Sequence, residues 1–307
     1  MGGERKFTAG LARFFGGARG VRIGIGDDAA VVRNPARDSV VCCDPVVASV
    51  HFDGDADPAL VGRKAVNRNL ADLAAMGATP DWLLVSLVLP RGWPAAHRSR
   101  LLRGIRAAAR AGGAHVVGGD VATVRGPLVV TVTAIGHLQG RALLRSAARA
   151  GDLLHVTGPL GGSRLGHHLR FSPPLRAGRW LARGNSPVRA AIDVSDGLLL
   201  DLHTMLQASG GLGAELDARA LPVSRDALRQ ARGDRDAAIR AALADGEDHE
   251  LLFTVPRRRR LPAGGPLTAA ARRPIGRVLA RPGLWLVDGD TRRRVAPEGH
   301  EHDLAAS

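Results

Sequence analysis

The sequence predicts a two-domain α/β (α+β) protein in which mixed sheets are flanked by helices. Short apolar runs typical of strands alternate with runs whose apolar residues recur at helical spacing. The 307 residues exceed one ordinary compact domain and suffice for two, each with its own core. Apolar residues make up 45% of the chain and charged residues 23%, which is the balance of a globular protein.

The first half of the chain alternates expected strands with two expected helices. In the first of these helices Val66, Leu70 and Leu73 recur at spacings of four and three, and Gly77 ends it. The expected strands are 21–25, 29–33, 39–47, a buried strand 82–89, and 128–138, and the expected helices are 57–76 and 95–111. A Gly- and Arg-rich connector follows, so we expect domains 1–139 and 140–307.

The second half has a similar alternation. Its clearest helix, 196–209, directly follows a strand at 190–194 and is stopped by Gly210 and Gly211. One face of that helix is apolar, formed by Leu198, Leu199, Leu202, Met205 and Leu206. Two short helices are expected within 165–183, and further strands at 153–157, 214–216, 250–255, 274–279 and 284–287.

Composition excludes several classes of protein. The formal charge of +14 is almost entirely arginine scattered along the chain, and the dense run Arg257 to Arg260 is expected to form a solvated loop. Aromatic residues are 3% and tyrosine is absent, so stacking surfaces for nucleic acid are scarce. The longest apolar runs fall short of the roughly 20 residues that cross a membrane. We therefore expect neither nucleic-acid nor membrane binding.

Cysteine usage favours a cytoplasmic location. The only two cysteines, Cys42 and Cys43, are neighbours and cannot form a disulfide framework. The first ten residues, MGGERKFTAG, lack the apolar segment of a secretory signal.

Aspartates recur where strands are expected to meet turns or helices. Asp27 and Asp28 are adjacent, and adjacent carboxylates repel unless solvent or a cation neutralises them. The others are Asp44, Asp120, Asp193 and Asp196, with Asp72 in a helix. A single such aspartate is ordinarily a cap or turn residue. Several together suit Mg²⁺, which takes carboxylates, water and substrate phosphates.

Two segments add to this pattern. The pair Gly118 and Gly119 before Asp120 allows the backbone to approach a bulky anion. In AIDVSDG, Ser195 is placed to cap a helix that begins at Asp196, and a helix N-terminus favours phosphate. The phosphate loop GxxxxGK[ST], protein-kinase signatures and zinc-ligand spacing are absent.

Seven segments, in this order, resemble those of thiamine-monophosphate kinases, a family of the aminoimidazole ribonucleotide synthetase superfamily. They are GIGDDAAVV, DPVVASVHF, NLADLAAMGATP, GGD with RGPLVVTVTAIG, LLRSAARAGDLLHVTGPLG, AAIDVSDGLLLDL and DGEDHELLFTVP. The resemblance implies the two-domain fold of that superfamily, with an N-terminal ATP- and metal-binding domain that dimerises and a C-terminal domain that completes the active site. It also implies ATP-dependent phosphorylation of thiamine monophosphate to thiamine diphosphate, by direct in-line transfer assisted by Mg²⁺.

The resemblance also assigns residues. The implied metal ligands are Asp28, Asp44, Asp72, Asp120, Asp193 and Asp196, of which Asp193 and Asp196 are the implied catalytic pair. Gly119, Asp120, Arg145 and Ser195 would contact ATP, and His51, Glu247 and His300 would hold thiamine monophosphate. Asp27 would have a supporting role beside Asp28.

Departures from the family pattern keep two alternatives open. Cys42, Cys43 and Pro45 surround Asp44 where the family has Ser, Thr and Thr, and thiols are poor Mg²⁺ ligands. Further departures are Ala48, Ser49, Ala71, His249 and His300. The alternatives are a superfamily enzyme with another phosphorylated acceptor, or a catalytically weakened protein that binds nucleotide or thiamine phosphates.

Overall fold

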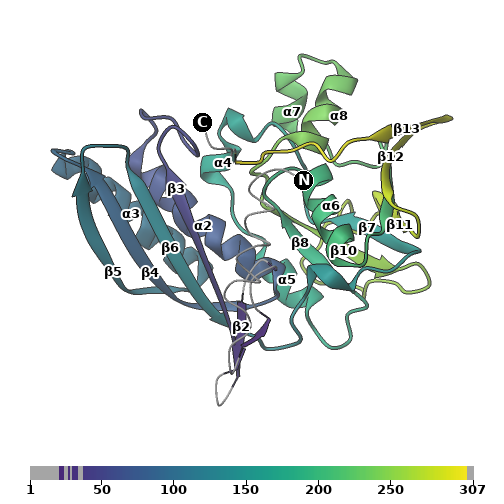
Figure 1. The fold of residues 1–307 in the computed structure, drawn as a ribbon, viewed down its shortest axis with the longest axis horizontal. Helices are drawn as coiled ribbons and strands as arrows, with labels where there is room; N and C mark the ends of the chain where they lie inside the picture. Colours follow the sequence, from purple (N-terminus) through teal and green to yellow (C-terminus); the bar gives the residue numbers. More distant parts are fainter. Residues whose placement is uncertain (1–20, 24–26, 28–29, 34–36, 303–307) are drawn as a thin grey trace.

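Two mixed sheets form the framework of the chain (Figure 1). The computed structural model describes residues 21–23, 27, 30–33 and 37–302. The first sheet has the strand order β1-β2-β3-β6-β4-β5, with β4 and β5 parallel and the other neighbours antiparallel. Its strands are β1 (Val21–Ile23), β2 (Ala30–Arg33), β3 (Asp38–Val47), β4 (Thr79–Pro90), β5 (His115–Val124) and β6 (Val129–His137).

The second sheet is built from the later part of the chain, in the order β13-β12-β9-β11-β7-β10-β8. Only the β12–β9 pair is parallel among its described neighbours. Its strands are β7 (Asp152–Val156), β8 (Ala191–Val194), β9 (Gly213–Asp217), β10 (Glu250–Pro256), β11 (Gly276–Leu279), β12 (Gly283–Asp288) and β13 (Thr291–Val295). The predicted mixed α/β class is therefore confirmed.

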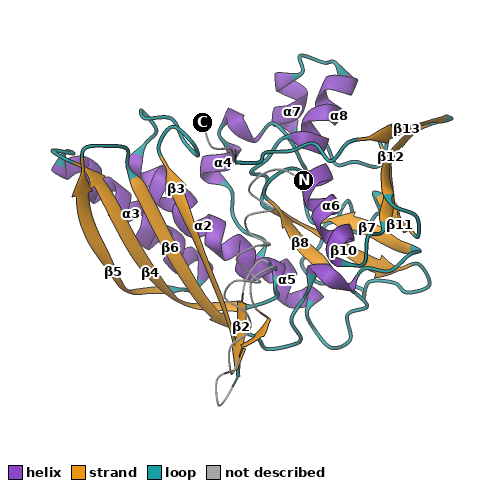
Figure 2. Cartoon of the chain, viewed as in Figure 1, coloured by secondary structure: helices purple, strands orange, loops and turns teal. Residues whose placement is uncertain are grey.

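Helices cover both sheets (Figure 2). In Figure 1, α2 and α3 lie behind the first sheet, while α6, α7 and α8 belong to the second half. The described α-helices are α2 (Pro58–Ala75), α3 (Ala95–Gly112), α4 (His167–Arg170), α5 (Leu175–Leu181), α6 (Leu198–Ala208), α7 (Arg225–Gln230) and α8 (Arg235–Ala244), and short 3₁₀ turns lie at η1 (Arg145–Ala147) and η2 (Ser163–Leu165). None of these helices is long and apolar enough to cross a membrane.

Helix α2 connects the two halves. Asp57 caps its start by accepting a hydrogen bond from the Ala59 amide at 2.9 Å. The helix contacts α3, β3 and β6 on one side and α4, α5 and β8 on the other. Its apolar residues share one hydrophobic cluster with Leu181 and Phe253 of the second half, while a second cluster lies wholly within residues 148–286. The division into domains 1–139 and 140–307 stays a prediction.

Several local expectations were wrong. Strand β5 was not expected, and Asp44 and Asp120 lie inside β3 and β5 and not at strand ends. The expected buried strand within β4 is buried on one face only, because Trp82 and Leu84 are exposed. Helix α6 begins after Gly197 without a side-chain cap, so Ser195 does not cap it. Helices α7 and α8 and strand β13 were also missed.

Helices α2 and α3 lie very close together at Gly104, and this contact gives the first prediction. A Cβ atom on Gly104 of α3 would lie 2.0 Å from the Ala59 carbonyl oxygen of α2, so only glycine fits. Gly104→Ala is expected to lower the free energy of unfolding by about 1–3 kcal/mol, although alanine favours a helix by about 1 kcal/mol. Urea denaturation measures the change. Gly184→Ala, which would meet nothing within 4 Å, is the control, and equal stability of the two variants would contradict the prediction.

A buried carboxyl group gives the second prediction. Both oxygens of Asp248, which is 2% exposed, accept the Gly161 amide at 2.9 Å. Burial, aided by Asp245 and Glu250, raises the pKa of Asp248 to about 8. An unfolded chain releases this proton near pH 4, so the folded state binds more protons between about pH 4 and pH 8. The stability that this carboxyl group contributes therefore falls as the pH rises through that range.

Asp248→Asn removes this titration and keeps a carbonyl acceptor for Gly161. The variant is expected to gain stability relative to the wild type as the pH rises from 5 to 8. Urea denaturation at several pH values measures the difference. A difference that is constant over this range would contradict the assignment.

Candidate active site

One small cavity collects predicted site residues from both halves of the chain. It encloses about 70 Å³, well below the roughly 300–1,000 Å³ of most ligand pockets, so it does not by itself hold two substrates. Five of the residues around it were predicted as site residues: His51, Ser195, Asp196, Glu247 and His300. Its other walls are Val50, Arg68, Ser163, Arg164, Gly246, His249 and His302.

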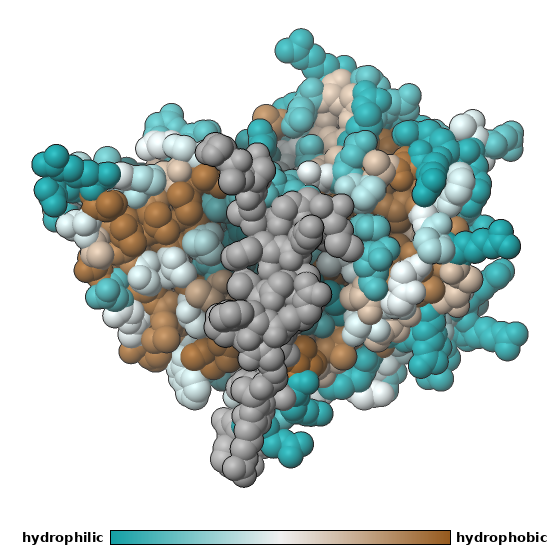
Figure 3. Space-filling view, viewed as in Figure 1, coloured by the Kyte–Doolittle hydropathy of each residue, from teal (hydrophilic) through white to brown (hydrophobic). Residues whose placement is uncertain are grey.

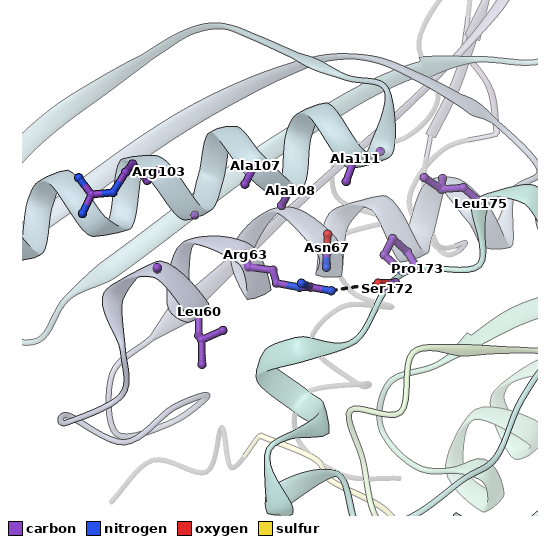
Figure 4. Close-up of a pocket in the computed structure, with 13 residues that line it drawn as sticks. Leu60, Arg63, Asn67, Arg103, Ala107, Ala108, Ala111, Ser172, Pro173 and Leu175 are labelled. Atoms are coloured by element: carbon purple, nitrogen blue, oxygen red, sulfur yellow. Dashed lines mark hydrogen bonds between the residues drawn. The ribbon is translucent and has the colours of Figure 1, made fainter.

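A larger groove between α2 and α3 has a different character. It encloses about 460 Å³ and contains no predicted site residue (Figure 4). Alanines of α3 line one side, and Arg63 extends to Ser172, whose hydroxyl accepts its hydrogen bond at 3.0 Å. The chemistry predicted from the sequence is therefore at the smaller cavity.

Arg68 of α2 lines this cavity and interacts electrostatically with four carboxylates. Its guanidinium lies 3.3 Å from a carboxylate oxygen of Asp44, which β3 supplies. Burial lowers the pKa of Arg68, but the carboxylates outweigh burial and raise it. These carboxylates are Asp44, Glu247, Asp72 and Asp196. Three of the six predicted metal ligands are thus near enough to Arg68 to affect its charge, although only Asp44 has a recorded contact with it.

Cys42 lies beside the same carboxylates. Its thiol is buried and lies 3.3 Å from the Asn69 carbonyl oxygen. Burial, followed by the charges of Asp72 and Asp44, raises the pKa of Cys42 well above its usual value. The sulfur therefore stays a protonated thiol at neutral pH and does not add a metal-binding thiolate to the carboxylates.

His51 is held in one tautomer. The Val47 amide donates to Nδ1 at 3.1 Å, so in the neutral ring the proton is on Nε2. Burial, followed by the charge of Arg68, lowers the pKa of His51 to about 4. At neutral pH His51 therefore offers the cavity one hydrogen-bond donor and no charge.

The end of β8 supplies Asp193, Ser195 and Asp196. Asp193 is buried, and one of its oxygens lies 3.6 Å from Nδ1 of His249. Two hydrogen bonds fix the backbone of Asp196. Its amide donates to the Asp201 carboxylate at 2.9 Å, and its carbonyl oxygen accepts from the His300 amide at 2.8 Å. The second bond attaches the C-terminal segment to the cavity.

His249 is one of the positions at which the sequence departs from the pattern of the family that it resembles. The ring is 1% exposed and stacks on Phe171, with 4.1 Å between ring centroids. Neither of its ring nitrogens has a hydrogen-bond partner among the described residues. The ring therefore acts here as an aromatic packing surface beside Asp193.

Other predicted residues lie apart from the cavity. Asp120 is exposed on β5, and β6 and β4 separate that strand from β3, which places it about 14 Å across the sheet from β3. Gly119 has a φ of 152°, and a Cβ atom there would lie 1.8 Å from the Val85 carbonyl oxygen, so glycine is required. Arg145 pairs with Asp27 at 3.2 Å. Asp28 lies outside the described residues.

The chemistry of the carboxylates fits magnesium. Among the residues that the structure describes, no three His, Cys, Asp or Glu side chains are grouped closely enough to hold a metal ion. Arg68 instead lies among them. However, Mg²⁺ is usually held by one or two carboxylates, with water and substrate phosphates completing its shell. Asp44, Asp72 and Asp196 can supply such ligands.

Sequence reasoning missed Lys64 and Arg68. Together with Asp72 they occur at intervals of four residues, which places all three on one face of α2. Lys64 has no exposed surface and pairs with Glu247 at 2.5 Å. The spacing of these charges by four residues was a signal that they share one face of the helix.

Comparison with known proteins finds relatives along nearly the whole chain. Residues 26–138 match the family model of AIR synthase related protein, N-terminal domain. The thiamine-monophosphate kinase of Rhodopirellula baltica is 39% identical over 305 residues, covering 94% of this chain and 94% of the relative. That of Mycobacterium tuberculosis is 41% identical over 295 residues, covering 88% of this chain and 83% of the relative.

A solved structure agrees with these relatives. AaThiL complexed with AMPPCP and TMP superposes with a TM-score of 0.84 at 27% sequence identity, covering 97% of this chain and 96% of that chain. The predicted fold and resemblance are thereby confirmed. Because curated relatives align at this level of identity from one half of the chain to the other, the chain belongs to the thiamine-monophosphate kinase family.

Proposed function

We propose that this protein transfers the γ-phosphoryl group of ATP directly to the phosphate of thiamine monophosphate, giving thiamine diphosphate. The observation that carries the proposal is the single cavity in which His51, Asp196 and Glu247 meet, in a chain of this family. The relative AaThiL was solved with AMPPCP and TMP, which supports the same pair of substrates here.

The described residues supply positioning and charge. We assign His51, Glu247 and His300 to thiamine monophosphate, and Ser195, Gly119, Asp120 and Arg145 to ATP. His51 can donate from Nε2 to a substrate oxygen, and Glu247 is ionised because the ion pair with Lys64 outweighs burial and lowers its pKa. The acceptor is a phosphate oxygen already ionised at neutral pH, so no dedicated base is needed.

Two polyanions must approach in line, and their repulsion is the main barrier. Mg²⁺, when bound, would neutralise the phosphates. Asp44, Asp72, Asp193 and Asp196 are the assigned residues at or near the cavity that would hold it. Asp28, outside the described residues, and Asp120, which lies apart on β5, complete the assigned set. Arg68 lies beside Asp44 and offsets part of the negative charge of the neighbouring carboxylates.

One observation favours a second candidate function. Cys42, beside Asp72 and Asp44, is a protonated thiol and a poor Mg²⁺ ligand where the family has serine, as expected for a protein that binds thiamine phosphates without efficient turnover. Binding of both substrates without product formation distinguishes this candidate from the enzyme. An enzyme with another phosphorylated acceptor would hydrolyse or transfer from ATP but leave thiamine monophosphate unchanged.

We also propose a homodimer formed through the first sheet. Its outer face is apolar over β4, β5 and β6 (Figure 3). The large apolar side chains exposed on this face include Trp82 and Leu84 of β4 and Val124 of β5, which the strand register pairs with Pro90 of β4. An exposed patch of this kind on an edge strand marks an interaction surface. The cytoplasmic location that the sequence favours remains a prediction.

The kinase assignment predicts product from purified protein with ATP, Mg²⁺ and thiamine monophosphate. Asp193→Asn and Asp196→Asn are each expected to lower kcat by about 10²-fold or more, because each removes charge that organises the phosphates. Chromatographic detection of thiamine diphosphate measures the rate. Asp290→Asn, at an exposed turn, is the control. Absence of product from the wild type, or full activity of both variants, would contradict the assignment.

The dimer predicts sensitivity to charge on the outer face of β4. Leu84→Asp, at a position that is 40% exposed, is expected to convert a dimer into a monomer, because it places a charge in an apolar interface. Sedimentation velocity measures the mass. Leu228→Asp, at an exposed apolar position on α7, is the matched control. A wild-type monomer at micromolar concentration would rule out the dimer.

A further inference from the structure

Lys64 has an unusual environment. Only two lysines occur in the chain, and this one lies in the middle of α2 with no exposed surface. Its ammonium group contacts Glu247 at 2.5 Å and also donates to the His51 carbonyl oxygen. It therefore bonds two segments, far apart in the sequence, that both line the candidate active site.

Stability alone does not explain a buried ion pair of this kind. Removing an ammonium and a carboxylate from water costs several kcal/mol per ion, and a hydrophobic pair of similar volume is often equally stable or more stable. Burial lowers the pKa of Lys64, and the attraction of Glu247 offsets only part of that effect. A role that depends on where these two charges are placed explains the buried ion pair better than stability does.

The segment that contains Glu247 is strained. Glu247 has a φ of 64° and His249 a φ of 52°, a backbone region that non-glycine residues seldom occupy. The Glu247 amide donates to the Ser195 carbonyl oxygen at 2.6 Å, and the His249 amide donates to that of Val194 at 2.7 Å. These bonds hold the backbone of the segment, and Lys64 holds the only carboxylate of that segment that lines the cavity.

The wall formed by His51 depends on Lys64 in the same way. The His51 amide donates to the Val47 carbonyl oxygen at 2.9 Å, and the Val47 amide donates to the ring of His51. This closes a tight turn whose own carbonyl oxygen faces Lys64. A single ammonium group thus sets the separation between the His51 ring and the Glu247 carboxylate.

We propose that Lys64 is a positioning residue, which fixes the Glu247 carboxylate and the His51 turn at the spacing that thiamine monophosphate requires. This inference rests on the proposed function and adds a residue to it. Lys64 itself is buried beneath the cavity and need not touch the substrate.

A double-mutant cycle tests the proposal kinetically. Lys64→Met and Glu247→Gln are each expected to raise the KM for thiamine monophosphate about tenfold, with kcat and the KM for ATP changing less than about threefold. If Lys64 acts through Glu247, the double variant is expected to resemble Glu247→Gln alone, whereas independent roles would multiply to about 100-fold. The double variant also contains no unpaired buried charge, so it remains informative if Lys64→Met folds poorly.

Val66→Ala is the matched control for stability. Val66 is buried in the same helix, and two residues along a helix rotate its side chain by about 200° away from that of Lys64. The control is expected to lower the Tm while leaving the KM for thiamine monophosphate unchanged. If the KM for thiamine monophosphate rose by a similar factor in Val66→Ala, lost stability alone would explain the rise. That result would overturn the proposal.

Hydrogen exchange provides a readout that does not need activity. In Lys64→Met the amides of Glu247 and His249 are expected to exchange faster than in the wild type and in Val66→Ala, because the segment loses its anchor. An unchanged exchange rate, or an unchanged KM for thiamine monophosphate, overturns the role of Lys64. Lack of kinase activity in the wild type would overturn the proposed function instead, and the exchange rates would still decide the role of Lys64.

Discussion

The site depends on repulsion among carboxylates that face one side of α2. Asp44, Asp72, Asp196 and Glu247 come from separate elements and converge on Arg68. Negative charges near one another are unfavourable unless cations lie among them. Lys64 and Arg68 provide that compensation within the chain. Because these carboxylates need positive charge nearby, the site also suits Mg²⁺. A bound Mg²⁺ would neutralise the carboxylates and the phosphates of the substrates together.

Helix α2 can support this arrangement because most of its other buried residues are apolar. It packs against the first sheet and against elements of the second half, so its position is fixed from both sides. Carboxylates from β3, from the end of β8 and from the segment before β10 therefore meet one rigid charged face. The core and the site are thus two faces of the same helix.

Regular elements with clear periodicity were predictable from the sequence, and those with weak patterns were not. Helix α2 and helix α6 were expected because their apolar residues recur at three and four, and the expected ends agree within two residues. Strand β5 was missed because its paired glycines resemble a turn, although Gly119 in fact allows close contact with β4. Helices α7 and α8 are short and rich in Arg, Ala and Asp. They therefore lack the apolar stripe from which a helix is predicted.

The site was predictable to a similar degree. Family motifs identified His51, Ser195, Asp196, Glu247 and His300, which share one cavity. Spacing of motifs cannot show which side chains meet in three dimensions, so the separation of Asp120 from the others became visible only in the fold. The roles of Lys64 and Arg68 depend on contacts with residues up to 183 positions away, and no local pattern contains that information.

The central claim is that these carboxylates bind divalent cations beside the phosphates of two substrates. A crystal structure with Mn²⁺, a nonhydrolysable ATP analogue and thiamine monophosphate tests it most directly, because anomalous scattering locates the metal. The account predicts Mn²⁺ bonded to carboxylate oxygens of Asp44, Asp72 or Asp196, with a phosphate oxygen in the same shell. Metal and nucleotide bound elsewhere, with these carboxylates still neutralised only by Arg68, would contradict it.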